Sequence, residues 1–271
     1  MGKEQVLGWT KVVNAAFGKP VAALLMWLHI RPENPEYPIP NHIAMELLVF
    51  AFAVLFFLWL RGRIRADRPG ATQQVMELLL VNPMGVGIRD LLEDIVGHGS
   101  EQHIPLIGTV ALFIFFSNML AVVPGLMSPT AAVTVPLGCA VVVFIYYNRF
   151  GLKKHGVGGY AKTLLGPVPA ISPIMFVVET FSHFARLLSL TVRLWANMMV
   201  SELIFVSFLG LSIGLFTFLG HRNAAGYASA IVPVGIPLAL TFFHIFEAVL
   251  QAFIFTILSI VYLGLATAEE H

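Results

Sequence analysis

The stretch LSLTVRLWANMM at residues 188–199 places Arg193 inside an apolar run that extends from residue 171 to residue 219 with few interruptions. An arginine side chain is effectively always charged, and centring it in a bilayer costs at least ~2.5–3.5 kcal/mol on insertion scales. The composition nevertheless indicates a bilayer. Of 271 residues, 58% are hydrophobic and only 11% are charged, whereas soluble domains carry roughly 25% charged residues. We therefore expect an all-α integral membrane protein.

Five apolar segments are long enough to cross a membrane, which takes about 20 helical residues. They cover residues 43–60, 104–123, 131–147, 171–219 and 230–266. The last two are overlong, and the fourth would extend roughly 70 Å if unbroken, so we expect tilts, kinks or breaks in them. Residues 72–103 mix apolar runs with charges and predict an amphipathic surface helix instead of a span. Residues 1–42 form an amino-terminal segment, and residues 1–271 a single membrane domain.

Two basic clusters give the expected orientation. RGRIRADR at residues 61–68 follows the first segment, and NRFGLKKHGVGGYAK at residues 148–162 follows the third. Basic residues favour the cytoplasmic side, and both clusters fall on the same side of a five-segment topology. The amino terminus is therefore expected outside, with the carboxyl terminus and the amphipathic helix on the cytoplasmic side. The glycine run at residues 156–160 is expected to form a flexible loop.

Several classes of function lack support in the sequence. The single Cys139 excludes a disulfide within the chain and a cysteine-based zinc site. The net charge is +1, and no long basic run suggests nucleic acid. No phosphate-binding glycine loop, metal-ligand cluster or internal repeat is visible. We expect neither a cofactor nor a metal.

A polar stripe runs along the fourth segment. On a helical wheel of ~100° per residue, five polar residues fall within about 40° of Arg193: Glu179, Ser182, Arg186, Ser189 and Asn197. Polar side chains can simply hold membrane helices together, but a coherent stripe favours function. Glu179 is spaced to neutralise Arg186. Arg193 has no acid within four residues on its face, so its counter-charge is expected from elsewhere, another chain included.

The last segment carries a matching polar face. His244, Glu247 and Gln251 are spaced three and four residues apart, and Tyr262 continues the same face. Histidine carries protons near neutral pH, and an acid inside the membrane is a functional candidate by default. A hydrogen-bonded packing role for His244 alone is the structural alternative.

The expected topology sorts these residues by depth. If Gln251 lies level with Arg193, one pocket forms on the outer side from Glu202, His244 and Glu247. A second pocket forms on the inner side around Glu179 and Ser182. A permanent positive charge would stand between the two pockets.

Other functions fit the pattern less well. A secondary transporter also places charges at mid-membrane, but such proteins show internal repeats and paired broken helices. A voltage sensor would carry arginine at every third position, whereas Arg186 and Arg193 lie seven residues apart. An intramembrane hydrolase would need a paired nucleophile and base, and the adjacent Ser182 and His183 do not face each other on a helix. A pure scaffold leaves Arg193 unexplained. The transporter remains the main alternative.

Several motifs together resemble one known family. LSLTVRLWANMMVSELI (188–204) and FHIFEAVLQAFIFTILSIVYL (243–263), with EEH (269–271), FIFFSNMLAVVPG (113–125), SPTA (128–131) and GLKKHGVGGY (151–160), resemble subunit a of the F-type rotary ATP synthase. The resemblance covers roughly residues 40–271. Its specificity comes from the arginine motif and the Gln–Ala–Phe motif in the right order and spacing.

The resemblance implies a proton-conducting stator subunit, with no catalytic site for ATP in this chain. The topology fits a bacterial plasma (inner) membrane, with an organelle-encoded homologue as the alternative. Its implied partners are the ring of c subunits, the peripheral-stalk b subunits, the rest of the complex and membrane lipid. Two offset half-channels would serve the ring's carboxylates, and the two overlong segments would lie strongly tilted against the ring. Whether protons or sodium ions are coupled depends largely on the ring, although His244 favours protons.

The resemblance also implies roles for individual residues. Arg193 resembles the family's essential arginine, with Asn197 and Gln251 as its neighbours. Glu202 and His244 resemble an outer-channel pair, and Glu179 an inner-channel acid. Glu247 matches a less regular acidic position, and Arg186 a basic position that pairs locally.

Overall fold

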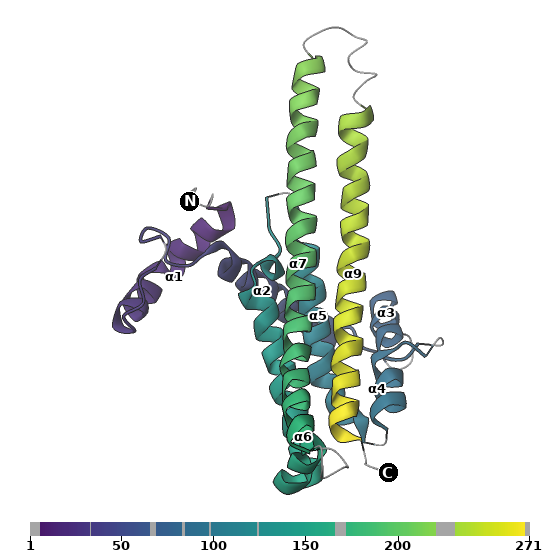
Figure 1. Cartoon of the computed structure of the whole chain (residues 1–271). Coiled ribbons are helices and arrows are strands. Elements are labelled where there is room, and N and C mark those ends of the chain that lie inside the picture. The colour runs from purple at the N-terminus through teal and green to yellow at the C-terminus, as the bar shows by residue number, and fades with distance from the viewer. Residues whose placement is uncertain are drawn as a thin grey trace. The chain divides into compact units, whose positions relative to one another are not determined.

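The structure is a computed structural model that describes residues 6–32, 34–65, 69–82, 85–97, 99–123, 125–165, 172–220 and 231–268. These residues form helices and short connections, with no β-strand among them (Figure 1). Five of the helices are long and apolar enough to cross a membrane. The predicted fold class is therefore confirmed. The terminal EEH motif at 269–271 lies outside the described residues.

The spanning helices are α2 (Asn41–Arg61), α5 (Ile104–Leu120), α6 (Thr134–Leu165), α7 (Ser172–Gly220) and α9 (Ile231–Thr267). The shorter helices are α1 (Gly8–Trp27), α3 (Ala71–Leu80) and α4 (Ile88–Val96), with 3₁₀ turns η1 (Ser100–His103) and η2 (Pro129–Ala131). As expected, the last two spanning helices are the longest, at 49 and 37 residues. At 1.5 Å per residue, α7 extends roughly 70 Å, far more than a hydrocarbon core about 30 Å thick.

The chain forms two compact units that alternate along the sequence. Unit 1 comprises Met1–Val54, Ile114–Ala132 and Ala196–Leu250, and unit 2 comprises Leu55–Phe113, Val133–Trp195 and Gln251–His271. The long helices α7 and α9 therefore contribute one part to each unit. Each unit gathers residues that are far apart in sequence.

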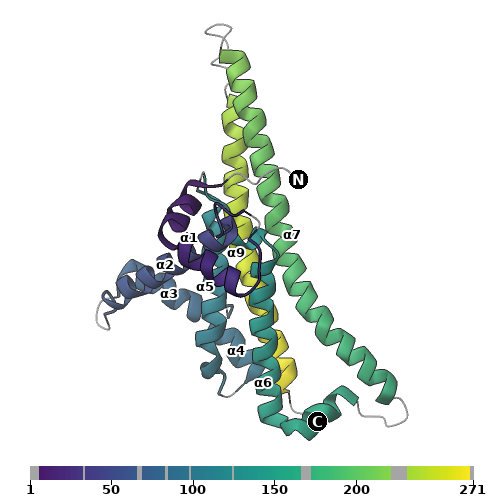
Figure 2. The ribbon, with the colours of Figure 1, turned by 90° about the vertical axis from the view of Figure 1, so that its left-hand side faces the viewer.

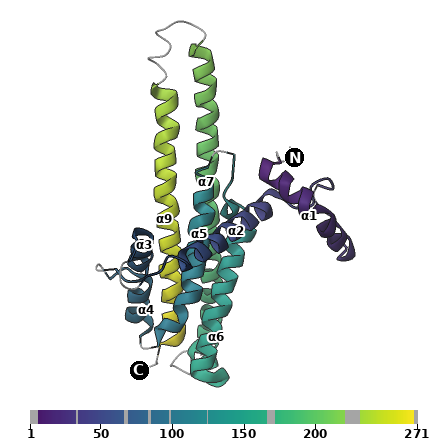
Figure 3. The same ribbon diagram turned by 180° about the vertical axis from the view of Figure 1, so that it is seen from behind.

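In unit 1, α1 and α2 follow each other along the chain (Figure 3), and a buried asparagine joins α1 to the proline-rich segment before α2. The Asn14 amide donates to the carbonyl oxygens of Thr10 and Ile39, each at 2.9 Å, and its oxygen accepts the Ile39 N–H at 3.0 Å. The Trp9 indole N–H donates to the Ala44 carbonyl at 2.9 Å. These bonds satisfy backbone groups that the prolines leave outside regular structure. They fix α1 to the start of α2.

In unit 2, the predicted amphipathic helix at 72–103 is instead two helices, α3 and α4, followed by η1. A Cβ atom on Gly87 would lie 2.5 Å from the Leu80 carbonyl oxygen, so the chain turns back tightly between the helices. The Asp90 carboxylate accepts the Asn82 N–H at 2.8 Å and stabilises this turn. The prediction of one helix was wrong because the backbone becomes extended at Val81 (φ −132°, ψ 114°) and a second helix starts after Gly87.

The glycine run at 156–160 is not the loop that the sequence suggested. The chain stays helical on both sides of Gly156, which has φ 69° and ψ 170°, a conformation that essentially only glycine adopts. This break turns α6 sharply near its carboxyl end (Figure 2) and returns Tyr160 to a buried position against Gly151. A Cβ on Gly151 would lie 2.6 Å from the Tyr160 ring. The glycines therefore allow a fixed turn.

A close helix contact in unit 2 gives a test of packing. A Cβ on Gly264 of α9 would lie 2.6 Å from Ile95 Cγ2 and 3.0 Å from the Ile95 carbonyl oxygen of α4. We expect Gly264→Ala to force α4 away and to lower the free energy of unfolding by about 1–3 kcal/mol. The measurement is the thermal unfolding midpoint of the purified membrane complex. Gly108→Ala is the matched control, because nothing lies within 4 Å of its Cβ position. Equal midpoints for the two variants would contradict the contact.

Candidate functional site

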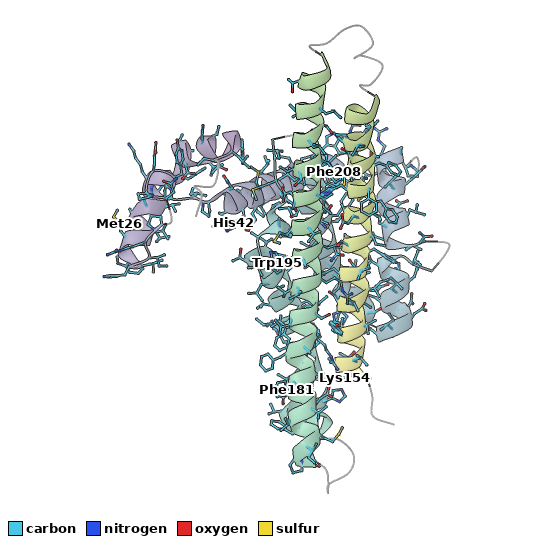
Figure 4. All side chains as sticks on the ribbon, turned by 45° about the horizontal axis from the view of Figure 1, so that its top comes forward. Met26, His42, Lys154, Phe181, Trp195 and Phe208 are labelled. Carbon is cyan, nitrogen blue, oxygen red and sulfur yellow. The ribbon has the colours of Figure 1, made fainter. Side chains whose placement is uncertain are left out.

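Arg193 lies on a face of α7 that the chain itself leaves uncovered. Arg193 is exposed, as are the apolar side chains of Leu188 and Val192, whereas Leu190 and Leu194, roughly 60° and 100° round the helix from Arg193, are buried. Large apolar side chains project from much of α7, Phe181 and Trp195 among them (Figure 4). Within the part of the chain that the structure describes, no carboxylate lies within ion-pair distance of Arg193. Its charge is available to a group from outside the chain.

Arg186, seven residues before Arg193 on the same stripe, is by contrast paired within unit 2. Its Nη2 lies 3.3 Å from Glu179 Oε1, which is the ion pair that the spacing predicted. Its guanidinium also lies over the ring of Tyr262 from α9, 5.7 Å from the ring centre. Salt bridge and cation–π contact together balance this charge locally.

Arg186 belongs to a larger polar group, which we call the Glu179 cluster. It consists of Tyr147, Asn148 and Tyr160 of α6, Glu179, His183 and Arg186 of α7, and Tyr262 of α9. The hydroxyl of Tyr147 lies 3.3 Å from His183 Nδ1, and His183 Nε2 lies 3.8 Å from Glu179 Oε1. The Tyr160 hydroxyl donates to Asn148 Oδ1 at 2.7 Å. All seven residues lie in unit 2, and the cluster joins three helices through titratable groups.

A second polar group, the Glu202 cluster, lies in unit 1. It consists of Ser117 and Asn118 at the end of α5, Ser128 and Thr130 at η2, Ser201 and Glu202 of α7, and His244 and Glu247 of α9. Glu202 Oε1 accepts the Ser128 N–H at 3.3 Å. The Ser201 hydroxyl lies 2.8 Å from His244 Nδ1. The three residues that the sequence predicted for an outer pocket, Glu202, His244 and Glu247, all belong to unit 1, and their grouping into one pocket stays a prediction.

The turn at η2 supports this cluster through hydroxyl groups. The Ser128 hydroxyl donates to the Ser117 carbonyl at 3.0 Å and lies 2.6 Å from the Thr130 hydroxyl. Thr130 in turn donates to Asn118 Oδ1 at 2.6 Å. These bonds hold the Ser128 N–H in place beside Glu202.

Several polar atoms of the Glu202 cluster are buried without a hydrogen-bond partner among the described residues. They are Ser117 Oγ, Asn118 Nδ2, His244 Nε2 and Glu247 Oε2. A buried polar atom without a partner costs about 1–3 kcal/mol, and water is the ordinary partner of such atoms in protein interiors. The cluster is therefore chemically suited to proton transfer.

The remaining predicted site residues lie on α7 and α9. Ser182 and Asn197 are half-buried, Ser189 is exposed, and Gln251 is buried at 3% exposure. Sequence analysis missed His183, Tyr147, Ser128 and Ser201 as members of the clusters. The four-residue spacing of Glu179 and His183 was a usable signal. The contacts of Ser128 and Tyr147 join segments distant in sequence, so no spacing could have indicated them.

The likeness to known proteins extends over most of the chain. The protein family described as ATP synthase A chain matches residues 43–264. The chain belongs to this family. Proteins named ATP synthase subunit a from Koribacter versatilis and Solibacter usitatus are both 38% identical to it, over 98% and 86% of this chain and 98% and 90% of theirs. The subunit a of Aquifex aeolicus is 36% identical over 85% of this chain and 99% of its own length.

Family membership confirms the resemblance that the motifs indicated. As a member of the ATP synthase A chain family with five helices that can span a membrane, this is a multi-pass membrane protein of ATP synthase. It takes part in ATP synthesis and ion transport.

The hydroxyl bonds at η2 can be tested with an isosteric change. Thr130→Val removes the donor to Asn118 in a buried site, and we expect it to destabilise the protein by about 1–3 kcal/mol. The thermal unfolding midpoint of the purified complex measures this loss. Thr109→Val is the matched control, because the exposed Thr109 hydroxyl bonds only within its own helix, to the Pro105 carbonyl. A Thr130→Val midpoint as high as the control's would show that the bond is dispensable.

Proposed function

We propose that this family member is the proton-translocating stator subunit of the ATP synthase, which passes protons to and from carboxylates on a ring of c subunits. The observation that carries the proposal is Arg193, a permanent charge that is exposed on α7 and has no acidic partner among the described residues. A carboxylate supplied by another subunit would balance that charge. The two titratable clusters provide groups that can deliver protons to such a carboxylate and remove protons from it.

The Glu202 cluster serves as the outer half-channel in this proposal. Its unpartnered buried atoms, on His244 and Glu247 among others, suit a path along which protons and water exchange. A proton that enters there neutralises a ring carboxylate. The neutral acid can then rotate into lipid, where a charge would be costly.

The Glu179 cluster serves as the inner half-channel, with Ser182 beside it. After nearly a full turn of the ring, the protonated carboxylate meets Arg193. A fixed guanidinium favours the charged form of a nearby carboxylate, so the proton leaves toward Glu179. Asn197, Ser189 and Gln251 are polar neighbours that orient the arginine and the ring carboxylate. The same positive charge repels a proton that would pass directly between the half-channels.

The energy of a single proton is too small to make one ATP, so the rotating ring has to combine the energy of several protons. Each charge that crosses 100 mV releases ~2.3 kcal/mol, so several protons are needed for each ATP. Within this scheme the long helices α7 and α9 lie tilted against the ring, and the peripheral-stalk b subunits hold the chain against rotation. The basic residues after α2 and on α6 favour a bacterial inner membrane topology with the amino terminus outside and the carboxyl terminus in the cytoplasm.

The first test replaces the central charge. We expect Arg193→Ala to abolish ATP-driven proton pumping in membrane vesicles while the complex stays assembled, because nothing then drives the ring carboxylate to release its proton. Passive proton leak after removal of the catalytic head should rise, because the barrier between the half-channels is lost. Arg149→Ala is the matched control: it removes an exposed arginine of α6 that lies outside both clusters, and it should leave pumping and leak unchanged. Normal pumping by Arg193→Ala would overturn the proposed function.

The second test addresses the outer half-channel. Glu202→Gln combined with His244→Ala removes two titratable groups of the Glu202 cluster and should slow proton-driven ATP synthesis severalfold in an assembled complex. Glutamine can still accept the Ser128 N–H, so the turn at η2 should survive. ATP synthesis in energised vesicles is the measurement. An unchanged synthesis rate would remove these residues from the proton path.

A further inference from the structure

His183 has a position in the Glu179 cluster that neither the motif resemblance nor the family comparison assigns. Its side chain is 13% exposed, against 31% for Glu179, so it is the more deeply placed of the two titratable groups. It lies one helical turn after Glu179 on α7 and turns toward α6. There its Nδ1 meets the Tyr147 hydroxyl at 3.3 Å.

Both ring nitrogens of His183 have a polar neighbour. Nε2 lies 3.8 Å from Glu179 Oε1, and Nδ1 lies at the Tyr147 hydroxyl. An imidazolium carries an N–H on each nitrogen. A proton added to His183 therefore finds a carboxylate on one side and a hydroxyl oxygen on the other, without any movement of the helices.

The charge on Glu179 is already balanced by Arg186 at 3.3 Å. The pair leaves the neutral imidazole as the proton acceptor of the cluster. The phenols of Tyr147 and Tyr160 also face the His183 imidazole. Their ring centres lie 6.0 Å and 6.5 Å from the imidazole centre. Tyr262 of α9 packs against Tyr147, with ring centres 6.2 Å apart. The rings of Tyr147 and Tyr160 lie near the imidazole from α6, whereas Glu179, on its Nε2 side, has a 31% exposed side chain.

We infer that His183 is a proton-binding residue of the inner half-channel, which takes the proton that the ring releases and passes it on beside Glu179. This inference rests on the proposed function. The proton leaves a ring carboxylic acid through water and binds the lone pair of an imidazole nitrogen. It then departs from Nε2 to water beside Glu179, and neutral imidazole is restored. Each step moves one proton and leaves the Arg186–Glu179 pair intact.

The test measures passive proton flux through vesicle-embedded complexes after removal of the catalytic head, with the cytoplasmic pH varied from about 5.5 to 8 around the range in which imidazole titrates. The total proton-motive force is held constant. The proton flux of the wild type, plotted against cytoplasmic pH, should show a step in this range. His183→Gln, which keeps a polar side chain of similar size, should lower the flux severalfold at neutral pH and remove the step.

His155→Gln is the matched control, because it removes a half-buried histidine of α6 that lies outside the cluster. It should leave both flux and step as in the wild type. A His183→Gln complex that retains the pH step overturns the inference, whether or not its flux falls, since a packing role would change the flux without removing a titration.

A second variant protects the test against a complex that assembles poorly. In Glu179→Gln the imidazole remains, so flux should weaken while the step survives. The double variant combines Glu179→Gln with His183→Gln. Its proton flux should fall by about as much as in the more strongly affected single variant, because the two residues act in one relay. Additive losses would contradict a shared relay. If Arg193→Ala behaves as expected but His183→Gln does not, only this inference fails; if Arg193→Ala pumps normally, the proposed function fails with it.

Discussion

The central constraint on this protein is the cost of a permanent charge on an apolar membrane helix. Two arginines of α7 lie seven residues apart on one face and meet that cost differently. Arg186 pairs with Glu179 at 3.3 Å and lies over the Tyr262 ring. Arg193 is exposed, and within the described chain it has no carboxylate partner. The first arrangement neutralises the charge, and the second keeps it available to another subunit. The proposed function of the two polar clusters depends on Arg193 being left in this state.

Polar side chains can gather in such apolar surroundings because small residues and turns bring their backbones close. Gly151 leaves room for the ring of Tyr160, which orients Asn148 beside Tyr147. At η2, hydroxyl groups hold the Ser128 N–H against Glu202. In both cases the group that touches the titratable residue is itself held by a second polar contact. Such support keeps a membrane site in one geometry, because no bulk water competes for its bonds.

The sequence predicted the elements better than their contacts. Runs of apolar residues located all five spanning helices, because a bilayer imposes length and hydrophobicity directly on the chain. Helical spacing also predicted the Arg186–Glu179 pair, since both residues lie on one helix. It could not predict that Tyr147 meets His183, because that contact depends on how two helices pack. The break at Gly156 was mistaken for a loop, since a glycine-rich run allows a tight fixed turn as readily as a flexible connection.

The two clusters have similar components but different charge balance, and this difference suits opposite tasks. Each contains an acid, a histidine and hydroxyl groups. The described contacts of Glu202 come from a neutral backbone N–H, so protonation of its carboxylate breaks no ion pair. Glu179 is held by a guanidinium, so a proton that arrives there is better accommodated on the neighbouring imidazole. A site without a fixed counter-charge can load a proton at little structural cost. A site with one retains its carboxylate and lets the proton move on, which is the asymmetry that directional transfer requires.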